Sequence, residues 1–179
     1  MRLQAVDLSG RDFLIQYFTI FAEFGGKIPW LDGLDEMRFA TNPEWFRDEL
    51  LRKLGQRDGQ LTPYQFVTED QPRTFQGGIL HFDQHPERFA DAANASVEEW
   101  LSSQGYGYIS CLQVRMPFRS AGVGTETFRR ALTAILDAHG SVWGVVSEAR
   151  LLQWYIKLGA SVHSPPSNKD HLWIVSWSC

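Results

Sequence analysis

Apolar residues recur at helical spacing in several stretches of the chain. The stretch from about residue 125 to 139 shows the pattern most clearly, with an apolar face formed by Phe128, Ala131, Leu132, Ile135 and Leu136. Gly140 follows this stretch, and a glycine is a common helix stop. The same kinds of signal predict helices at residues 11–24, 41–55, 96–103, 125–139 and 150–158.

Shorter apolar runs between these helices have strand character. Residues 64–69 and 74–82 flank the turn Asp70-Gln71-Pro72, so we expect a hairpin. Residues 106–115 form an apolar run typical of a buried central strand. Further strands are expected at residues 3–6, 142–146, 160–164 and 171–177. The order β-α-α-β-β-α-β-α-β-α-β-β predicts an α+β fold of mixed α/β character, with a central mixed sheet flanked by helices.

The length and charge of the chain narrow the class of protein. Its 179 residues suggest one domain, which can bury a core without disulfides or a metal. The 44% hydrophobic and 21% charged composition excludes a disordered, collagen-like or coiled-coil chain. The net charge is −4, and neither the first 60 residues nor the remainder is basic. This balance argues against nucleic acid as the main partner and agrees with a cationic or amine substrate.

The cysteines and the N-terminal segment indicate a compartment. Cys111 and Cys179 are the only two cysteines, which does not make a disulfide framework. The N-terminus lacks the basic and then apolar pattern of a signal peptide. The early apolar stretch 13–21 is too short to span a bilayer. We therefore expect a cytoplasmic protein with no membrane partner.

The most informative segment is residues 112–125, LQVRMPFRSAGVGT. It predicts a buried strand, a short turn and a helix N-terminus that carries Gly122 and Gly124. The first amides of a helix lack intrahelical partners and, with the helix dipole, form an anion site that glycines let a pyrophosphate approach. A Rossmann fingerprint would need a third glycine at Thr127. The glycines alone fit a tight strand-to-helix turn equally well.

Two blocks together resemble the GNAT acyltransferase superfamily. Motif A of that family is similar to a set spread over residues 112–124: Leu112, Val114, Arg119, Gly122 and Gly124. Motif B, a helix ending in Tyr-x-x-x-Gly-Phe, resembles the segment from Tyr155 to Gly159, with Ala160 in the last position. Glu148 stands where an asparagine is common. The resemblance covers residues 64–177, whereas residues 1–60 match only as two helices after a short strand.

The resemblance implies a GNAT fold in which the strand carrying Leu112 splays away from the strand of residues 142–146. The acyl-CoA-binding core would span residues 106–160, and residues 1–60 would shape the acceptor side. The free strand edge assigned to pantetheine is Leu112, Gln113 and Val114. The helix start assigned to the pyrophosphate is Arg119, Ser120, Ala121, Gly122, Val123, Gly124 and Thr125.

The resemblance makes Tyr155 the general acid that protonates the departing thiolate. A structural role, in which Tyr155 packs beside Trp154, is the alternative. The general base stays open, because several groups or a chain of waters could remove the amine proton. The residues considered are Tyr108, Glu69, His81 and Glu148.

Three weaker signals have structural explanations as well. His81, Asp83 and His85 alternate as a metal cluster would in a strand, but no further ligand is spaced near them, so we expect no metal. Cys111 fits a small buried residue better than a nucleophile. Trp30 and Phe24 could line an acceptor pocket.

The function expected is an N-acyltransferase that moves acetyl from acetyl-CoA to a primary amine by direct attack. The acceptor would be a small molecule or a protein. The alternatives are a non-catalytic acyl-CoA-binding or sensor protein on the same fold and an enzyme for a longer acyl donor. Charged tRNA is disfavoured by the acidic balance. Final strands in such folds often pair between subunits, which is consistent with a homodimer.

Overall fold

The computed structural model describes residues 2–5, 44, 45, 48, 49, 52, 61–67, 77–85, 89–114, 123–163 and 172–179. Within these ranges it describes only the backbone of residues 2–5, 61–67, 111–114, 123 and 127. The predicted helix at residues 11–24 lies outside the described residues. Residues 44, 45, 48, 49 and 52 are helical, in agreement with the prediction for residues 41–55.

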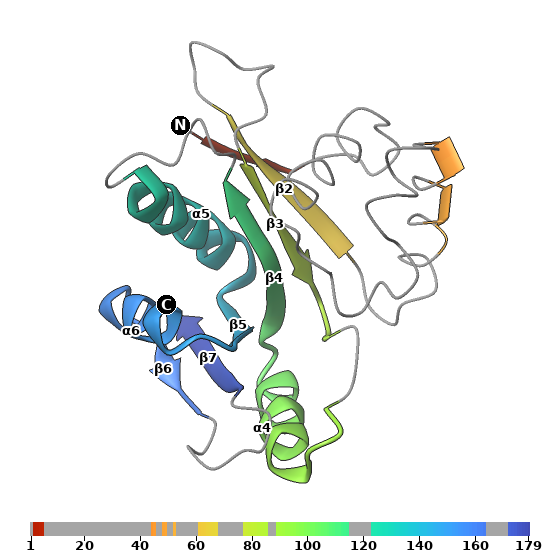
Figure 1. Cartoon of the computed structure of the whole chain (residues 1–179), viewed down its shortest axis with the longest axis vertical. Helices are drawn as coiled ribbons and strands as arrows, with labels where there is room; N and C mark the ends of the chain where they lie inside the picture. Colours follow the sequence, from red (N-terminus) through yellow and green to blue (C-terminus); the bar gives the residue numbers. More distant parts are fainter. Residues whose placement is uncertain are drawn as a thin grey trace.

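A seven-stranded sheet forms the centre of the described structure (Figure 1). Its order is β1-β2-β3-β4-β5-β7-β6. The β4–β5 pair is parallel and the other neighbours are antiparallel, so the predicted mixed sheet is confirmed. The strands are β1 (Arg2–Ala5), β2 (Leu61–Val67), β3 (Gly77–Phe82), β4 (Gly107–Val114), β5 (Ser141–Val146), β6 (Ser161–Val162) and β7 (Trp173–Ser178).

The predicted hairpin is the antiparallel pair of β2 and β3. Strand β2 begins three residues earlier than predicted and contains Pro63. The last pair that β1 makes with β2 is Ala5↔Tyr64, so Pro63 lies just past the described end of β1. Proline is tolerated at such an edge because it has no N–H to give to a neighbouring strand.

Three helices complete the described fold: α4 (Ala92–Ser103), α5 (Val123–His139) and α6 (Ala149–Lys157). Helix α4 begins four residues before the prediction because Asp91 caps it, accepting hydrogen bonds from the amides of Ala93 and Asn94. Gly140 follows α5 with a φ of 78°, a left-handed conformation that glycine adopts without strain. None of the described helices combines the length and apolar character needed to cross a membrane.

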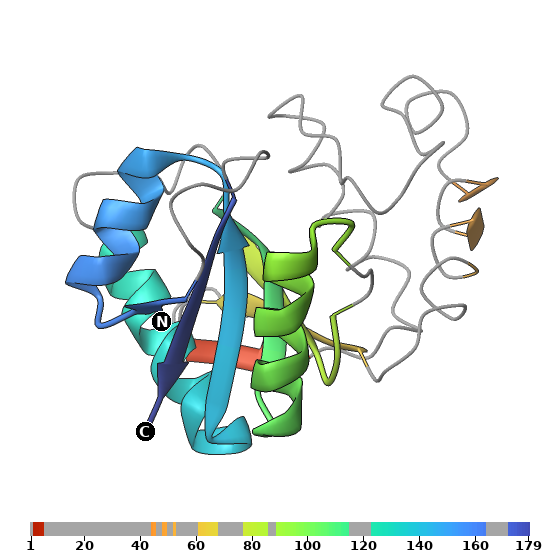
Figure 2. The same cartoon turned by 90° about the horizontal axis from the view of Figure 1, so that it is seen from below.

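The helices cover opposite faces of the sheet. Figure 2 shows α5 and α6 on one face and α4 on the other. The core beside α5 includes Ile79, Ile109, Phe128, Ala131, Leu132, Ile135, Val142, Val146, Val175 and Trp177. Buried residues with no place in that cluster include Leu80, Phe82, Leu101, Tyr108, Trp143 and Ile174. The apolar face predicted for residues 125–139 therefore packs on the sheet as expected.

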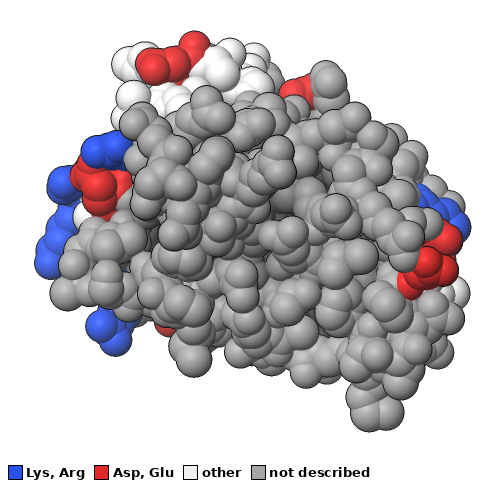
Figure 3. All heavy atoms as spheres, turned by 90° about the horizontal axis from the view of Figure 1, so that it is seen from above, with Lys and Arg blue, Asp and Glu red and all other residues white. Residues whose placement is uncertain are grey.

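Charged side chains of both signs lie beside one another on the described surface. On the face shown in Figure 3, basic and acidic groups lie next to each other at the left edge and at the right edge. Examples are the i,i+4 pair of Glu126 and Arg130 on α5 and the i,i+3 pair of Glu49 and Arg52. Such exposed pairs each contribute little to stability, and the mixture agrees with the small net charge of the chain.

Candidate active site

Strands β4 and β5 separate partway along their length. They pair in parallel at Gly107↔Val142 and Tyr108↔Trp143, and the register of these two described strands holds no later pair. A cavity of about 70 Å³ opens beyond the last pair. Its lining residues are Ile79, Tyr108, Ile109, Ser110, Phe128, Gly144, Val145, Tyr155, Val175 and Trp177. The splayed strands implied by the family resemblance are therefore present.

The cavity lies at the gap between the two strands, beside the core that faces α5. Ile109 packs in the core beside α5, and successive strand residues point to opposite faces. Its neighbours Tyr108 and Ser110, which also line the cavity, therefore direct their side chains toward the α4 face. Gly144 lines it from the other strand, and a Cβ there would lie only 3.2 Å from the carbonyl oxygen of Ile109. The glycine keeps the gap between the strands free of a side chain.

A bulge interrupts β4 next to the cavity. Gly78 pairs with Gln113, and the next pair recorded is Leu80 with Ser110. Two steps along β3 (78 to 80) therefore match three steps along β4 (113 to 110), so β4 carries one extra residue in the stretch that contains Leu112. Bulges leave backbone groups out of the regular ladder and are frequent beside active sites.

The backbone of Leu112, Gln113 and Val114 forms the end of β4 beyond the bulge. Gln113 and Val114 use one strand edge to pair with β3. Their other edge faces away from β3, at a level where the register with β5 has ended. Main-chain groups on that edge have no partner in the register of the described strands, and their pairing with pantetheine stays a prediction.

Helix α6 brings Tyr155 to the cavity. Its ring packs against Phe128 at 5.3 Å, Trp154 at 5.1 Å and, edge to face, Trp177 at 5.2 Å between ring centroids. Burial raises the pKa of Tyr155 to about 12, because the charged phenolate is poorly solvated there. The hydroxyl therefore stays protonated at neutral pH, in the state from which it can donate. Tyr155 therefore both packs beside Trp154 and lines the cavity.

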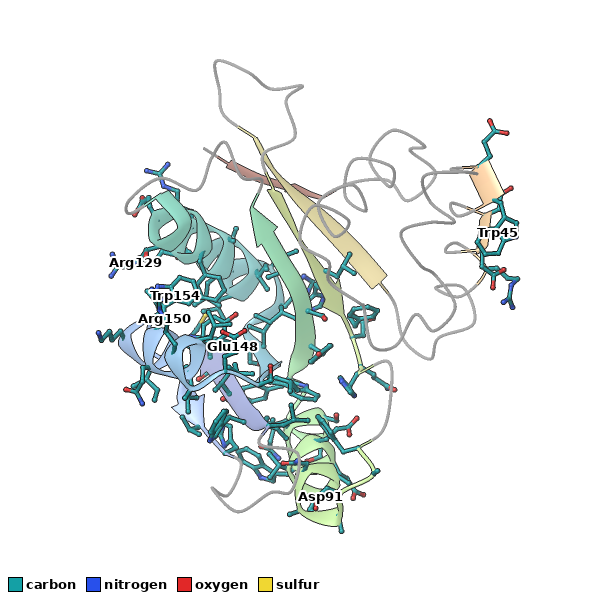
Figure 4. The ribbon with its side chains drawn as sticks, viewed as in Figure 1. Trp45, Asp91, Arg129, Glu148, Arg150 and Trp154 are labelled. Carbon is teal, nitrogen blue, oxygen red and sulfur yellow. The ribbon has the colours of Figure 1, made fainter. Side chains whose placement is uncertain are left out.

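The start of α5 contains part of the segment predicted to bind the pyrophosphate, a role that stays a prediction. Val123, Gly124 and Thr125 form its first turn, whereas residues 119–122 lie outside the described residues. A Cβ on Gly124 would meet no atom within 4 Å, so the backbone is approachable there. The indole N–H of Trp154 donates to the Thr125 hydroxyl at 3.2 Å and ties α6 to this turn. Figure 4 shows Trp154 between α6 and α5.

One of the candidate general bases lines the cavity. Tyr108 does so from β4. His81 is buried in β3 and stacks on His139 at 3.8 Å between ring centroids. Burial, reinforced by His139, lowers the pKa of His81 to about 4, although Asp83 raises it slightly. Glu148 is exposed at the N-cap of α6 and makes no side-chain capping bond, and Glu69 lies outside the described residues.

The alternating histidines do not come together. Strand β3 ends at Phe82, so the alternation stops before His85. His81 stacks on His139, while His85 pairs with Glu98 of α4. No group of three potential ligands forms a metal site among the residues that the structure describes. The side chain of Cys111 and the residues Trp30 and Phe24 lie outside them.

The sequence analysis missed several cavity residues, among them Ile109, Ser110, Gly144 and Val145. The one available signal was Gly144, a glycine inside an otherwise apolar strand, which marks a close approach or a distortion. The bulge in β4 carried no such signal, because its stretch contains neither glycine nor proline.

No protein-family model matches the chain, and no curated protein sequence matches it. Solved structures do match. The aminoglycoside acetyltransferase AAC(6')-Ib in complex with ribostamycin and coenzyme A is 14% identical, with 99% of this chain and 92% of that chain covered and a TM-score of 0.62. A spermidine N-acetyltransferase from Vibrio cholerae is 9% identical, with 99% of this chain and 95% of that chain covered and a TM-score of 0.60. An acetyltransferase from Thermus thermophilus is 16% identical, with 100% of this chain and 98% of that chain covered and a TM-score of 0.54.

The sheet order, the splayed strands and these matches agree. The chain has the fold of the GNAT acetyltransferases, so the expected fold and family resemblance are confirmed at the level of the fold. A fold of this kind hosts more than one function, and the reaction has to be argued from the site.

Proposed function

We propose that the protein is an N-acetyltransferase that uses acetyl-CoA as co-substrate and transfers the acetyl group to a primary amine of a small molecule or a protein. One observation carries the proposal: the cavity at the β4–β5 gap is lined by Tyr155, the residue for which the sequence suggested an acid role.

The main chain would hold the donor. The free edge of Leu112, Gln113 and Val114 would pair with the pantetheine arm, and the first amides of α5 would take the pyrophosphate. A backbone amide freed by the bulge would donate to the thioester carbonyl oxygen, where negative charge develops during attack. No metal has a part in this scheme.

Tyr155 would protonate the leaving thiolate. The amine nitrogen forms a bond to the carbonyl carbon, the C–S bond breaks, and the sulfur takes a proton from the Tyr155 hydroxyl. The nitrogen loses its surplus proton as the tetrahedral intermediate collapses, and that proton restores the hydroxyl. The phenol is protonated at neutral pH and can donate, although its raised pKa makes it a weaker acid than an ordinary tyrosine.

The acceptor class is supported by charge and by the solved structures. The net charge of −4 favours a cationic amine. Among proteins with this fold are a spermidine acetyltransferase and an aminoglycoside acetyltransferase. Location in the cytoplasm, a homodimer, a single domain over residues 1–179 and an acceptor role for residues 1–60 stay predictions from the sequence.

The test combines Tyr155→Phe with a panel of amines. We expect free thiol release from acetyl-CoA with at least one amine, and a loss of about 10²-fold in kcat in the variant. Calorimetry should show a Kd for coenzyme A within about twofold of wild type, because the hydroxyl acts in the transition state. Tyr106→Phe, which removes a hydroxyl outside the cavity lining, is the matched control.

Two results would contradict the proposal. Full turnover in Tyr155→Phe would remove the tyrosine from the mechanism. Tight binding of coenzyme A with no transfer to any amine would instead establish the non-catalytic sensor on this fold.

A further inference from the structure

We propose that the hydroxyl of Ser110 donates a hydrogen bond to the carbonyl oxygen of the bound thioester and stabilises the negative charge that develops there during attack. The inference rests on the proposed function, and it adds a side chain to the main-chain amide already assigned to this oxygen. When an amine attacks a thioester, the carbonyl oxygen gains charge. Donors that are fixed around that oxygen before the reaction lower the barrier, and a serine hydroxyl is one of the side-chain groups suited to this role.

Ser110 lies where the cavity begins. It lines the cavity from β4, and it comes two residues after Tyr108, whose pair with Trp143 is the last between the described parts of β4 and β5. Ser110 is half-buried, whereas Ile109 before it is 7% exposed. A ligand in the cavity can therefore contact Ser110 without a rearrangement of the strand.

The polar group that Ser110 offers to the cavity is its hydroxyl. The carbonyl oxygen of Ile109 lies on the β5 side of the strand, because a Cβ on Gly144 would be 3.2 Å from it. The N–H and C=O groups of successive strand residues point to opposite edges, so those of Ser110 point toward β3, where Ser110 pairs with Leu80. The main chain of Ser110 is used within the sheet, and its side chain is the part that can bind a ligand in the cavity.

The bulge in β4 begins directly after Ser110. Ser110 is the last residue in register before the bulge, and Gln113 is the first in register after it. The amide that the bulge frees therefore belongs to the short stretch between these two residues. A hydroxyl and an amide so close along one strand can both donate to one carbonyl oxygen, which has two lone pairs to accept them.

Tyr155 and Ser110 approach the cavity from different faces of the sheet. Tyr155 packs against the core beside α5, whereas the side chain of Ser110 is directed toward the α4 face, opposite to that of Ile109. The oxygen and the sulfur of a thioester are bonded to the same carbon and lie in different directions from it. The two hydroxyls can therefore donate to different atoms, Ser110 to the oxygen and Tyr155 to the sulfur.

Ser110 transfers no proton in this step. As the amine nitrogen bonds to the carbonyl carbon, the π electrons of the C=O bond move to the oxygen, and the hydrogen bond from Ser110 strengthens. When the C–S bond breaks, these electrons form the C=O bond of the new amide. The sulfur leaves with the electron pair of the C–S bond and takes the proton of Tyr155, so Ser110 ends the reaction unchanged.

Ser110→Ala removes the donor and leaves the main chain of β4 in place. We expect kcat to fall about 10²-fold, because the hydrogen bond is strongest in the transition state. Calorimetry should give an unchanged Kd for coenzyme A, which lacks the thioester carbonyl. Ser110→Thr keeps a hydroxyl and should retain most of the activity. Ser141→Ala makes the same change on β5, outside the cavity lining, and is the matched control.

A second measurement does not depend on turnover. Isotope-edited infrared spectroscopy reports the stretching frequency of the thioester carbonyl in acetyl-CoA that is bound to the protein in the absence of an amine. A hydrogen bond to the oxygen weakens the C=O bond and lowers this frequency. We expect a lower frequency in wild type and in Ser141→Ala than in Ser110→Ala.

The outcomes separate this inference from the proposed function. Equal frequencies in wild type and Ser110→Ala, with normal acetyl transfer, would overturn the role of Ser110 and leave the acetyltransferase intact. A loss of kcat in Ser110→Ala at an unmoved frequency would also overturn it, because the hydroxyl would then act on another atom. The frequency shift in a protein that acetylates no amine would overturn the proposed function and keep the hydrogen bond. A wild-type protein that binds no acetyl-CoA would overturn both.

Discussion

At the scale of single residues, His81 is a histidine buried in the sheet without hydrogen bonds to its ring from the described residues. Its side chain is 1% exposed, and neither ring nitrogen has a hydrogen-bond partner among the described residues. The ring occupies space that a side chain at Gly107 would fill, because a Cβ there would lie 2.3 Å from Nε2. Burial and the stacked His139 keep His81 neutral, since a charge at this position would have little solvation.

We expect His81 to make the protein less stable in mild acid. Its pKa falls from 6.5 to about 4 on folding, so below pH 6.5 the unfolded chain binds a proton that the folded chain refuses. The free energy of unfolding should therefore be fully retained above pH 6.5 and fall by about 3 kcal/mol as the pH drops to 4.

Urea unfolding of wild type and His81→Leu between pH 7 and pH 4 measures this contribution. The wild type should lose stability more steeply than the variant over that interval. His163→Leu, at a histidine that is only partly buried, serves as the comparison and should change the slope less. Equal slopes in wild type and His81→Leu would contradict the assignment.

At the scale of elements, the proposed function depends on two strands that stop pairing. Strands β4 and β5 begin as a parallel pair and then diverge, and the bulge in β4 lies at the same level. Gly144 keeps the space between them open. Strand separation leaves main-chain groups without ladder partners, and a bound ligand can satisfy them.

Gly144→Val should close the cavity while the fold survives. The added Cβ approaches the Ile109 carbonyl, and the branched methyl groups occupy the space assigned to the acetyl group. We expect kcat/KM for acetyl-CoA to fall at least about tenfold, with a smaller loss in Gly144→Ala. Ser141→Val, on the same strand and outside the cavity lining, is the control. Unchanged kinetics in Gly144→Val would show that the acetyl group binds elsewhere.

At the scale of the whole molecule, the proposed donor site is assembled from parts that are distant in the sequence. Strand β4 supplies an open edge, α5 supplies a helix start, and α6 supplies Tyr155. The bond from Trp154 to Thr125 joins two of these parts. A ligand that contacts all three would link them and would bind only the folded chain.

Coenzyme A should therefore raise the thermal stability of the protein. At a ligand concentration of one hundred times Kd, the gain in the free energy of unfolding is about 2.7 kcal/mol, which corresponds to a rise of about 5–10 °C in Tm. Differential scanning fluorimetry with coenzyme A and with pantetheine separates the stabilisation that comes from the pyrophosphate end from the stabilisation that comes from the pantetheine arm. Pantetheine lacks the pyrophosphate and should give a smaller shift; an equal shift would argue against the anion site on α5.

The amino-acid sequence sufficed for most of the elements. It also singled out Tyr155, which lines the cavity and whose acid role stays a prediction. Helical spacing located α5, glycines located helix ends, and two short motifs indicated the GNAT fold, because all these signals lie within one local stretch of chain. Helix α4 began earlier than predicted since its cap, Asp91, acts through a side-chain bond that apolar spacing does not report. The divergence of β4 and β5, the cavity and the contact of His85 with Glu98 arise between segments far apart along the chain. Such features follow from strand register and packing, and no local pattern of residue types encodes them.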